Sequence, residues 1–371
     1  MTEIPLRLGL QQRVLPNYRA PFFEALSNVC TGGLSLFTGQ PRKDEAIESA
    51  AGLRGAELYQ THNLHFFRGR AYLCWQAGVL KWLQSWKPQA LIIEANPRYL
   101  SSPRAIHWMH ARHRPVIGWG LGAPPDRSRL LALSRQPFLN SLDSVIAYST
   151  RGAEEYAAAG IDQRKIFVAP NAAAGRPASP PPERPIEIGN QRLSVLSIGR
   201  LQPRKRIDLL IHACALLPDE LQPELLIVGD GPVRVELESL ARNIYPRAHF
   251  FGARHGSDLE PLFQQADLFV LPGTGGLAVQ QAMAHALPVL VSEADGTQTD
   301  LVRPENGWLV PTGNFEALTS QLAKALGDLP RLRRMGAESY RIVDEEINIE
   351  KMVEVFAQAV QAACSGYACT M

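Results

Sequence analysis

Short apolar runs alternate with longer helical stretches along the whole of this 371-residue chain. The run Leu268–Leu271, which reads LFVL, shows no alternation of polar and apolar residues. Strands of this kind are typical of parallel sheets that carry helices on both faces. Because the pattern fills both halves, and about 150 residues make a typical domain, we expect an α/β chain with two doubly wound, Rossmann-like domains facing a cleft.

The apolar runs of the first half predict strands at Leu6–Leu10, Leu34–Thr38, Ala90–Glu94, Val116–Trp119, Ser144–Tyr148 and Ile166–Ala169. The helix-like segments between them are Ala20–Asn28, Leu73–Trp86 and Arg151–Ala159. The second half predicts strands at Val195–Ile198, Leu225–Val228, His249–Phe251, Leu268–Leu271, Val289–Ser292 and Trp308–Val310. Its helices are expected at Arg206–Leu217, Val233–Ile244, Leu259–Gln265, Leu277–His285, Phe315–Leu326, Pro330–Val343 and Ile349–Cys364.

A proline-rich stretch, GRPASPPPERP at Gly175–Pro185, divides the chain. Proline at this density continues neither a helix nor a central strand, so we interpret residues 175–188 as a semi-rigid linker. It separates a domain at residues 1–174 from a second at residues 189–345. Residues 346–371 would form a final helix that packs back on the first domain.

Charge is distributed unevenly along the chain. Residues 1–176 carry 21 Lys and Arg against 12 Asp and Glu, whereas the remainder carries 17 against 24. A basic first half could face an anionic partner such as a membrane surface, a lipid diphosphate or an anionic glycan. The alternative is a solvated surface that complements the acidic second domain. Nucleic acid is not expected, because no block of Lys interleaved with aromatic residues occurs.

The sequence indicates a cytoplasmic protein, either free or peripheral at the inner face of the cell membrane. Charged and polar residues interrupt the Met1–Leu15 stretch, so it does not resemble a signal peptide, and no apolar run is long enough to span a membrane. The cysteines are odd in number, scattered, and form no CxxC pair, which favours free thiols. They are Cys30, Cys74, Cys214, Cys364 and Cys369.

The stretch SIGRLQPRKRI carries the strongest chemical signal in the chain. Gly199 allows a sharp turn at the end of a predicted strand, Arg200 follows it, and Lys205 lies near the start of the next helix. A guanidinium and an ammonium on one edge of a sheet, beside helix amides, can neutralise a diphosphate. The alternative is a basic surface turn.

Two further glycine-containing turns follow predicted strands. In LLIVGDGP, Gly229 precedes Asp230, whose carboxylate could cap the next helix or contact a ligand. In LPGTGGLAVQQAMA, three glycines, Gly273, Gly275 and Gly276, leave room for a ligand beside the amides of the following helix.

Polar residues also follow strands of the first half. Glu94, Asn96 and Arg98 come after a buried strand in IIEANPRYL, where the carboxylate could orient an acceptor hydroxyl or serve in a turn. Arg13, Asn17 and Arg19 are expected in the loop after the first strand, where they could contact an acceptor or phosphate, or simply lie on the surface.

Three tryptophans, Trp75, Trp82 and Trp86, recur at helical spacing. Such residues are more often core than a sugar-binding surface, although beside Lys81 and Lys87 they could seat the domain on a membrane. The histidines of HWMHARH drift around a helix axis and lack a neighbouring carboxylate or thiolate, so no metal site is predicted.

The order of the short motifs in residues 193–330 resembles the donor domain of retaining GT-B glycosyltransferases, called glycosyltransferase group 1 or family 4. These motifs are SIGRLQPRK, LLIVGDGP, HFFG, LFVLP, the glycine-rich turn, GLAVQQAMA, LPVLVS and NGWLVPTGN. The first half is similar to the family's acceptor domain in layout. Its stretches QQRVLPNYRAPFFEAL, IIEANPRYL and VIGWGLG resemble bacterial enzymes that build surface glycans.

The resemblance implies a nucleotide diphosphate sugar as co-substrate, no other cofactor, and a glycan or lipid-linked acceptor. Arg200 and Lys205 match the family's diphosphate-binding pair and would act catalytically by stabilising the leaving phosphate. No metal is implied, and the chain has no Asp-x-Asp; Glu293-Ala-Asp295 comes nearest. Retaining transfer would let the leaving phosphate deprotonate the acceptor. The implied donor-binding residues are Gly199, Arg200, Lys205, Gly229, Asp230, Gly273, Thr274, Gly275, Gly276, Leu277 and Gln281.

The chain departs from the family at two positions. The family carries two glutamates separated by seven residues, and here Gly273 and Gln281 occupy those places. Gln281 can still bind ribose hydroxyls, whereas Gly273 offers only its backbone. Two alternatives therefore stay open: a non-catalytic relative that binds a nucleotide or partner, and a nucleotide-sugar epimerase.

Overall fold

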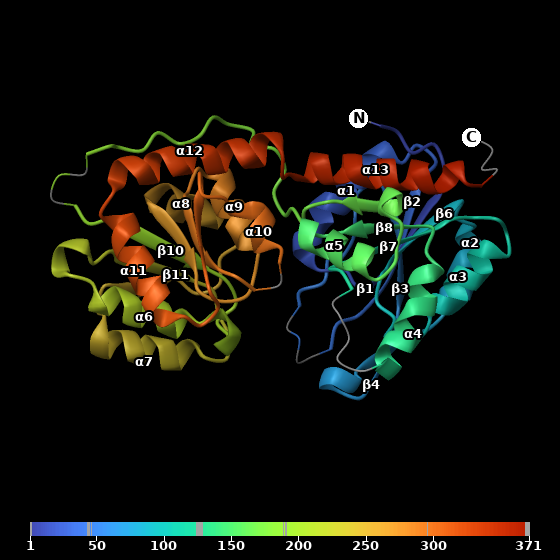
Figure 1. The fold of residues 1–371 in the computed structure, drawn as a ribbon, viewed down its shortest axis with the longest axis horizontal. Coiled ribbons are helices and arrows are strands. Elements are labelled where there is room, and N and C mark those ends of the chain that lie inside the picture. The colour runs from blue at the N-terminus through green and yellow to red at the C-terminus, as the bar shows by residue number, and fades with distance from the viewer. Residues whose placement is uncertain are drawn as a thin grey trace. The chain divides into compact units, whose positions relative to one another are not determined.

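The computed structural model describes residues 2–42, 45, 47–123, 129–187, 189, 191–294 and 296–367, without the side chains of residues 70 and 129–134. Asp295 and Cys369, both considered above, lie outside this part of the chain. The four described cysteines are free thiols. Contacts divide the chain into two compact units (Figure 1), one formed by Met1–Pro170 with Ile349–Met371 and the other by Asn171–Asn348.

The first unit is built on a seven-stranded parallel sheet with the order β3-β2-β1-β6-β7-β8-β9. Its strands are β1 Leu8–Val14, β2 Leu34–Gly39, β3 Ala56–Thr61, β6 Ala90–Glu94, β7 Val116–Gly120, β8 Ser144–Ala147 and β9 Ile166–Val168. A separate antiparallel hairpin pairs β4 Asn63–Phe66 with β5 Leu73–Gln76. The helices are α1 Ala20–Val29, α2 Val79–Trp86, α3 Ser102–His110, α4 Arg129–Asn140, α5 Thr150–Ala158 and α13 Ile349–Ser365.

The second unit contains a six-stranded parallel sheet with the order β12-β11-β10-β13-β14-β15. Its strands are β10 Ser194–Ile198, β11 Glu224–Val228, β12 Ala248–Phe250, β13 Leu268–Leu271, β14 Val289–Ser292 and β15 Gly307–Val310. Its helices are α6 Ile207–Leu216, α7 Arg234–Ile244, α8 Glu260–Gln265, α9 Leu277–Ala284, α10 Gln298–Leu301, α11 Phe315–Leu326 and α12 Leu329–Glu345.

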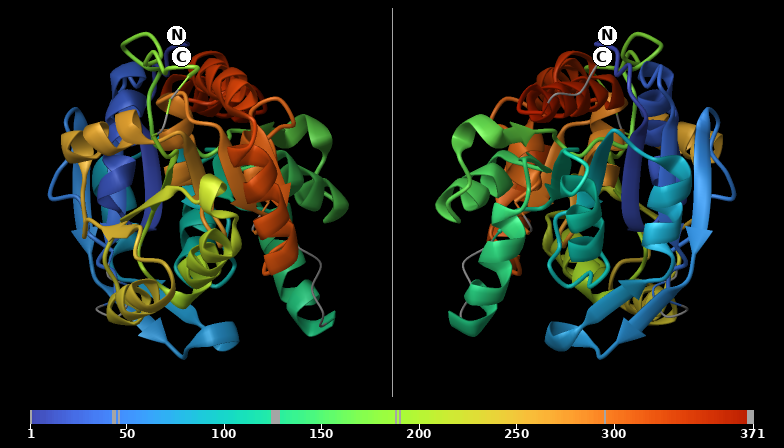
Figure 2. Two further views of the ribbon diagram at one scale, coloured as in Figure 1. Left: turned by 90° about the vertical axis from the view of Figure 1, so that its left-hand side faces the viewer. Right: turned by 90° about the vertical axis from the view of Figure 1, so that its right-hand side faces the viewer.

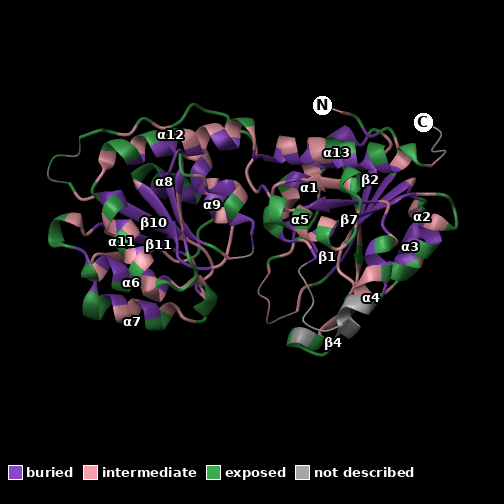
Figure 3. Ribbon diagram, viewed as in Figure 1, coloured by how far each residue is buried: buried purple, intermediate pink, exposed green. Residues whose placement is uncertain are grey.

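Both faces of the second sheet are buried, as the unbroken apolar strands predict. Val195 packs into a core with Leu210 and Leu322 on one face. The next residue, Leu196, packs with Met283 and Ile342 on the other face. Figure 3 shows the inner strands largely buried, whereas the edge strands β12 and β15 are partly buried and the covering helices expose their outer sides. The predicted α/β class with Rossmann-like units is therefore confirmed.

The last helix, α13, belongs to the first unit although it follows the second in sequence. Its Phe356 is fully buried, with ring centroids 4.9 Å from both Phe22 of α1 and Trp119 of β7. These aromatic edges anchor the helix to the sheet.

The proline-rich segment differs from the predicted linker at residues 175–188. The chain enters the second unit at Asn171, so this segment lies inside that unit. Arg184 holds it by donating to carbonyl oxygens of Phe263, Gln264, Ala266 and His285. The segment is non-helical, as its proline content predicts. It is not a free linker, because the Arg184 side chain binds it to the second unit.

Two predicted elements of the first half are wrong in their boundaries. The helix expected at Leu73–Trp86 begins only at Val79, because its first residues pair with β4 and Gly78 turns the chain at a φ of 81°. The first strand extends to Val14, so Arg13 lies in β1 instead of in a following loop. Its glutamines misled the prediction: Gln11 is buried and hydrogen-bonded to Gln76.

The structure also explains the tryptophan series. Trp82 is fully buried and donates to Ser35, and Trp86 donates to the backbone of Leu8. Trp82 belongs to the core and Trp86, which is partly buried, packs against it, while Trp75 lies on the separate hairpin strand β5. The three residues therefore share no helix face.

Candidate functional site

The diphosphate-binding candidates lie at the topological switch point of the second sheet. From β10 the chain pairs with β11 on one side and with β13 on the other. Arg200 and Lys205 follow β10, and the glycine-rich turn follows β13. In open parallel sheets, the space beyond the carboxyl ends at such a point is where ligands bind.

Direct contacts join the two turns. The amide of Thr274 donates to the carbonyl of Arg204 at 3.1 Å. The ammonium of Lys205 donates to the carbonyl of Thr274, and Arg204 approaches the Thr274 hydroxyl at 3.5 Å. The predicted pairing of the basic turn with the glycine turn is therefore present, and Arg204 is a contact that sequence reasoning missed.

Gly273 is the position where the family's first glutamate is absent, and the turn leaves no space for a side chain there. A Cβ atom at Gly273 would lie 2.2 Å from the carbonyl oxygen of Arg204. At Gly275, whose φ is 146°, a Cβ atom would lie 2.5 Å from the Lys205 ammonium. The glycines thus allow the cationic turn to approach the backbone closely.

The turn after β11 packs on the same cluster. A Cβ atom at Gly229 would lie 2.0 Å from the carbonyl oxygen of Gly199, and the amide of Leu201 donates to the carbonyl of Asp230 at 2.9 Å. The Asp230 carboxylate accepts from the amide of Gly231 at 2.7 Å and pairs with Arg234 at 3.2 Å. Asp230 therefore orders its own turn, and the capping role considered for it is wrong, because the N-cap of α7 is Val233 and no described side chain caps that helix.

Helix α9 begins at this cluster. Its N-terminal residue is Leu277, its N-cap is Gly276, and no side chain caps its first amides. Gln298, a buried residue that sequence reasoning missed, donates to the carbonyl of Gly275 at 2.7 Å. The Gln298 side chain therefore fixes the backbone of the glycine turn. The partial positive charge of the α9 N-terminus lies at the same turn.

Two neighbouring glutamines on α9 have different environments. Gln281, the ribose-binding candidate, is only partly buried. Gln280 is fully buried; its Oε1 accepts from the amides of Ala173 and Ala174, and its Nε2 donates to the carbonyl of Ile347 at 3.0 Å. Gln280 is structural, and the carboxamide available for a ligand is that of Gln281.

In the first unit, Arg13 and Glu94 meet at the carboxyl ends of β1 and β6. The amide of Arg13 donates to the Glu94 carboxylate at 3.0 Å, and its guanidinium donates to Glu45 at 2.8 Å. Burial raises the pKa of Glu94 and outweighs the lowering by Arg13 and Arg19. Burial alone would lower the pKa of Arg13, but the hydrogen bond to Glu45 brings it above its usual value.

The remaining acceptor-side candidates are less enclosed. Asn17 is exposed at the start of a 3₁₀ turn, and Arg98 is exposed after β6. The Asn96 side chain accepts from the amide of Arg98 at 3.1 Å, which is a local turn contact. Arg19 stacks on Trp119 with its guanidinium carbon 4.7 Å from the ring centre.

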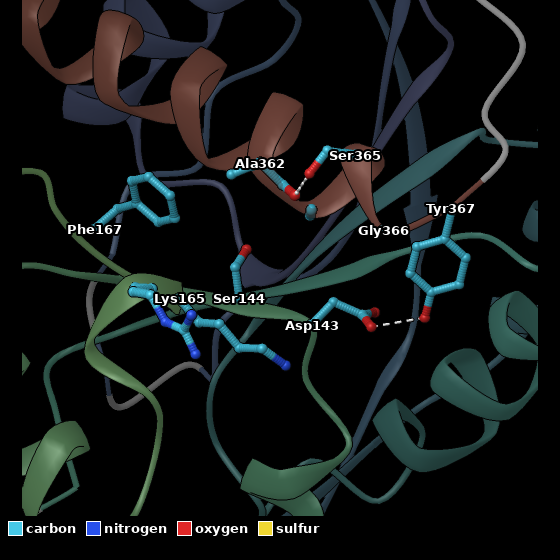
Figure 4. Close-up of a pocket in the computed structure, with 10 residues that line it drawn as sticks. Asp143, Ser144, Lys165, Phe167, Ala362, Ser365, Gly366 and Tyr367 are labelled. Atoms are coloured by element: carbon cyan, nitrogen blue, oxygen red, sulfur yellow. Dashed lines mark hydrogen bonds between the residues drawn. The ribbon is translucent and has the colours of Figure 1, made fainter.

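A cavity of about 360 Å³ lies at the opposite edge of the first sheet, where β8 and β9 begin (Figure 4). Asp143, Ser144, Lys165 and Tyr367 contribute to its lining, and the Tyr367 hydroxyl donates to Asp143 at 2.6 Å. The amino ends of parallel strands are not where ligands bind in such sheets. This cavity is therefore separate from the candidate site.

Within the described residues, no group of three or more His, Cys, Asp or Glu side chains is placed to hold a metal ion. Contrary to expectation, the histidines of HWMHARH do not all lie on one helix, because α3 ends at His110 and His113 follows it with a φ of 52°. His110 has a carboxylate neighbour that was not expected, Asp143 at 3.0 Å. Across the same residues, every helix is too short or too polar to cross a bilayer.

Comparison with known proteins places the second unit in a family. Residues 192–328 match the model of glycosyl transferases group 1. The chain is 39% identical over 123 residues to a GDP-mannose-dependent alpha-mannosyltransferase of Mycobacterium tuberculosis, covering 32% of this chain and 30% of that protein. It is 36% identical over 151 residues to the Mycolicibacterium smegmatis protein of the same name, covering 39% and 37%. The chain thus spans about a third of the length of these curated relatives.

The fold similarity extends over the whole chain. The structure of Anabaena HepE in complex with UDP superposes with a TM-score of 0.73 at 16% sequence identity, covering 98% of this chain and all of that one. At this identity the likeness shows the fold alone. Residues 192–328 are therefore similar to group 1 glycosyltransferases, and the chain as a whole has the GT-B fold.

Proposed function

We propose that the protein transfers a sugar from a nucleotide diphosphate sugar to a glycan or lipid-linked acceptor in the synthesis of bacterial surface polysaccharide. The observation that carries the proposal is the contact between the Lys205 turn and the glycine turn at the switch point of the family-matched domain. The relatives named GDP-mannose-dependent mannosyltransferases and the UDP complex of HepE support a nucleoside diphosphate as the ligand.

In the proposed reaction, the bond between the anomeric carbon and the diphosphate oxygen breaks as a bond to the acceptor oxygen forms. Arg200 and Lys205 stabilise the negative charge that develops on the leaving diphosphate, with the N-terminal amides of α9. The acceptor oxygen attacks from the face that the diphosphate leaves, so configuration is retained. The proton of the acceptor hydroxyl passes to the leaving phosphate, so no enzymic base is required. Because two side-chain cations do this work, we propose that transfer needs no metal ion.

The acceptor would bind at the carboxyl edge of the first sheet, beside Arg13 and Glu94. The Glu94 carboxyl group there can accept a hydrogen bond from a sugar hydroxyl, and its raised pKa favours the protonated form, which can also donate one. This supports a hydroxylated acceptor in the first unit. For the enzyme as a whole we propose a cytoplasmic location, at the inner face of the membrane.

One observation favours a second candidate, a non-catalytic nucleotide-binding relative. The backbone around Gly273 has no room for the carboxylate that the family places beside the donor sugar. Arg200 and Lys205 are nevertheless both present after β10, so this candidate also predicts nucleotide binding, but without turnover.

Calorimetric titration of UDP, GDP, ADP and dTDP, first without metal and then with magnesium, tests the proposal. Metal-independent binding of one diphosphate, followed by turnover of the matching sugar nucleotide, would support it. Binding without transfer would favour the non-catalytic relative, and conversion of the donor without an acceptor would favour an epimerase. Arg200→Ala with Lys205→Ala should abolish binding, and unchanged affinity would overturn the role of this pair.

A further inference from the structure

The β4–β5 hairpin carries an apolar face that the rest of its unit leaves uncovered. Strand pairing sets Leu64 opposite Trp75 and Phe66 opposite Leu73. Because side chains alternate along a strand, these four residues share one face, called here the hairpin face. Leu64 and Phe66 are 50% and 43% exposed, although both are large and apolar.

The opposite face of the hairpin is anchored to the unit. Gln76 is buried and donates to the carbonyl of Gln12, and Asn63 donates to the carbonyl of Arg13 at 2.7 Å. The backbone of Cys74 pairs with the segment that follows β6. The hairpin is therefore fixed at the carboxyl edge of the sheet and projects from it, as both views of Figure 2 show.

Two further apolar side chains enlarge the exposed surface. Phe67, at the tip of the hairpin, is 69% exposed and has a φ of 59°, which is uncommon for an aromatic residue. Leu100 is 39% exposed, and its amide donates to the carbonyl of Cys74, which places it beside β5. Contiguous exposed apolar groups of this kind mark an interaction surface.

Positive charge surrounds the hairpin face. Arg68 and Arg98 are exposed next to it, and the Arg104 guanidinium stacks on Trp75 at 4.7 Å from the ring centre. Residues 62–142 contain 11 Lys and Arg but only 2 Asp and Glu, Glu94 and Asp126. Glu94 accepts from the amide of Arg13 in β1, and Asp126 lies outside the described residues.

We infer that the hairpin face docks the first unit on a membrane surface rich in anionic phospholipid. Exposed Phe and Leu side chains enter the boundary between headgroups and acyl chains, and the arginines bind lipid phosphates. This inference deepens the membrane location given under the proposed function by naming the surface that binds, and it requires no catalytic activity. It also replaces the membrane contact that the tryptophan spacing suggested, since Trp82 belongs to the core and Trp86 packs against it.

Flotation of the full-length protein with phospholipid vesicles, without nucleotide or acceptor, tests the inference. The protein should float with vesicles of phosphatidylcholine and phosphatidylglycerol, and much less with phosphatidylcholine alone. Phe66→Ser with Phe67→Asn should lower the bound fraction about tenfold, because two aromatic anchors are lost. The matched control, Leu216→Ser with Val235→Ser, removes exposed apolar side chains from the second unit and should float like the wild type.

A second pair of variants tests the charge. Arg68→Gln with Arg104→Gln should lower binding to the anionic vesicles about tenfold, because each basic residue near an anionic surface contributes to binding. Arg242→Gln with Arg254→Gln removes the same charge from exposed positions of the second unit and should leave binding unchanged. High salt should reduce binding of the wild type.

Several results would overturn the inference. One is a wild type that floats with neither vesicle type, and another is a control pair that loses as much binding as the hairpin pair. If Phe66→Ser with Phe67→Asn instead changes the oligomeric state, a second copy covers the face. If it spares vesicle binding but impairs transfer to lipid-linked acceptors alone, the face holds the acceptor's lipid. Calorimetric titration of the same variants with nucleoside diphosphates separates the two proposals. Nucleotide binding without vesicle binding contradicts only this inference, whereas vesicle binding without nucleotide binding contradicts only the proposed function.

Discussion

The Gln280 side chain binds both segments through which the chain passes between its two units. Its Oε1 accepts from the amide of Ala174 at 2.7 Å, and its Nε2 donates to the carbonyl of Ile347 at 3.0 Å. The chain enters the second unit at Asn171 and leaves it at Asn348, so both partners lie within four residues of a crossing. Gln280 also lies on α9, the helix that begins at the candidate donor turn.

Gln280→Met should lower the free energy of unfolding by about 3 kcal/mol, because buried backbone amides and carbonyls lose their partners. Met has a similar volume, so packing changes little. Gln281→Met is the matched control, since this neighbour is only partly buried, and it should alter stability much less. Denaturant unfolding measures both, and equal effects would contradict the structural role given to Gln280.

Arg184 anchors the proline-rich segment to the second unit, so Arg184→Met should release it. The arginine donates to several backbone carbonyls, and burial lowers its pKa to about 10. We expect faster cleavage between residues 175 and 185 by proteinase K, with a loss of roughly 2 kcal/mol in stability. Arg176→Met removes a more exposed arginine of the same segment and should change the cleavage rate little. Rapid cleavage of the wild type at this segment would show that it is a free linker.

The second unit could be predicted more completely from sequence than the first, in which β2, β6, β7, β8 and β9 were expected but β3 and the β4–β5 hairpin were not. Unbroken apolar strands such as Leu268–Leu271 and Val289–Ser292 match the structure at both ends. In the first unit, polar side chains are buried in pairs: Gln11 binds Gln76, so β1 and β5 carry residues that look exposed in sequence. Partners distant in sequence satisfy these groups, and local patterns do not reveal such pairing.

The candidate site shows the same limit. The sequence placed Lys205 and the glycine turn on one edge, because the carboxyl ends of parallel strands lie together. The sequence did not predict a role for Gln298. Its hydrogen bond to the Gly275 carbonyl depends on the position of α10, which local sequence does not determine. The sequence also indicated an absent glutamate at Gly273, whereas the structure shows a close contact with the Arg204 carbonyl that requires glycine.

Glu94→Gln should stabilise the protein near neutral pH. Because burial raises the folded-state pKa of Glu94, its protonated form favours folding below the unfolded-state pKa, and this contribution is lost as pH rises through the folded-state value. Gln keeps an oxygen to accept from the Arg13 amide without the buried charge. The variant's thermal midpoint should exceed that of the wild type at about pH 8 and converge with it near pH 4.

The control for this pH dependence is Glu57→Gln, at an exposed position on β3 in the same unit. It removes the same charge from a site open to solvent, so the difference between variant and wild type should vary little with pH. If Glu94→Gln were instead most destabilising at high pH, the ionised carboxylate would be stabilised by Arg13 and Arg19, and the direction given for its pKa would be wrong.

Gly273→Ala tests whether the glycine turn exists to seat the cationic turn. The added methyl group would press on the Arg204 carbonyl, so the two turns must separate, at a cost of about 2 kcal/mol in stability. Lys205 would then lose its contact with the Thr274 carbonyl, and affinity for the nucleoside diphosphate should fall about tenfold. Gly52→Ala is the control, because a Cβ atom there meets nothing within 4 Å. Calorimetry and thermal unfolding measure both effects, and a Gly273→Glu variant that keeps stability while gaining transfer would show that the turn can accommodate the family's carboxylate.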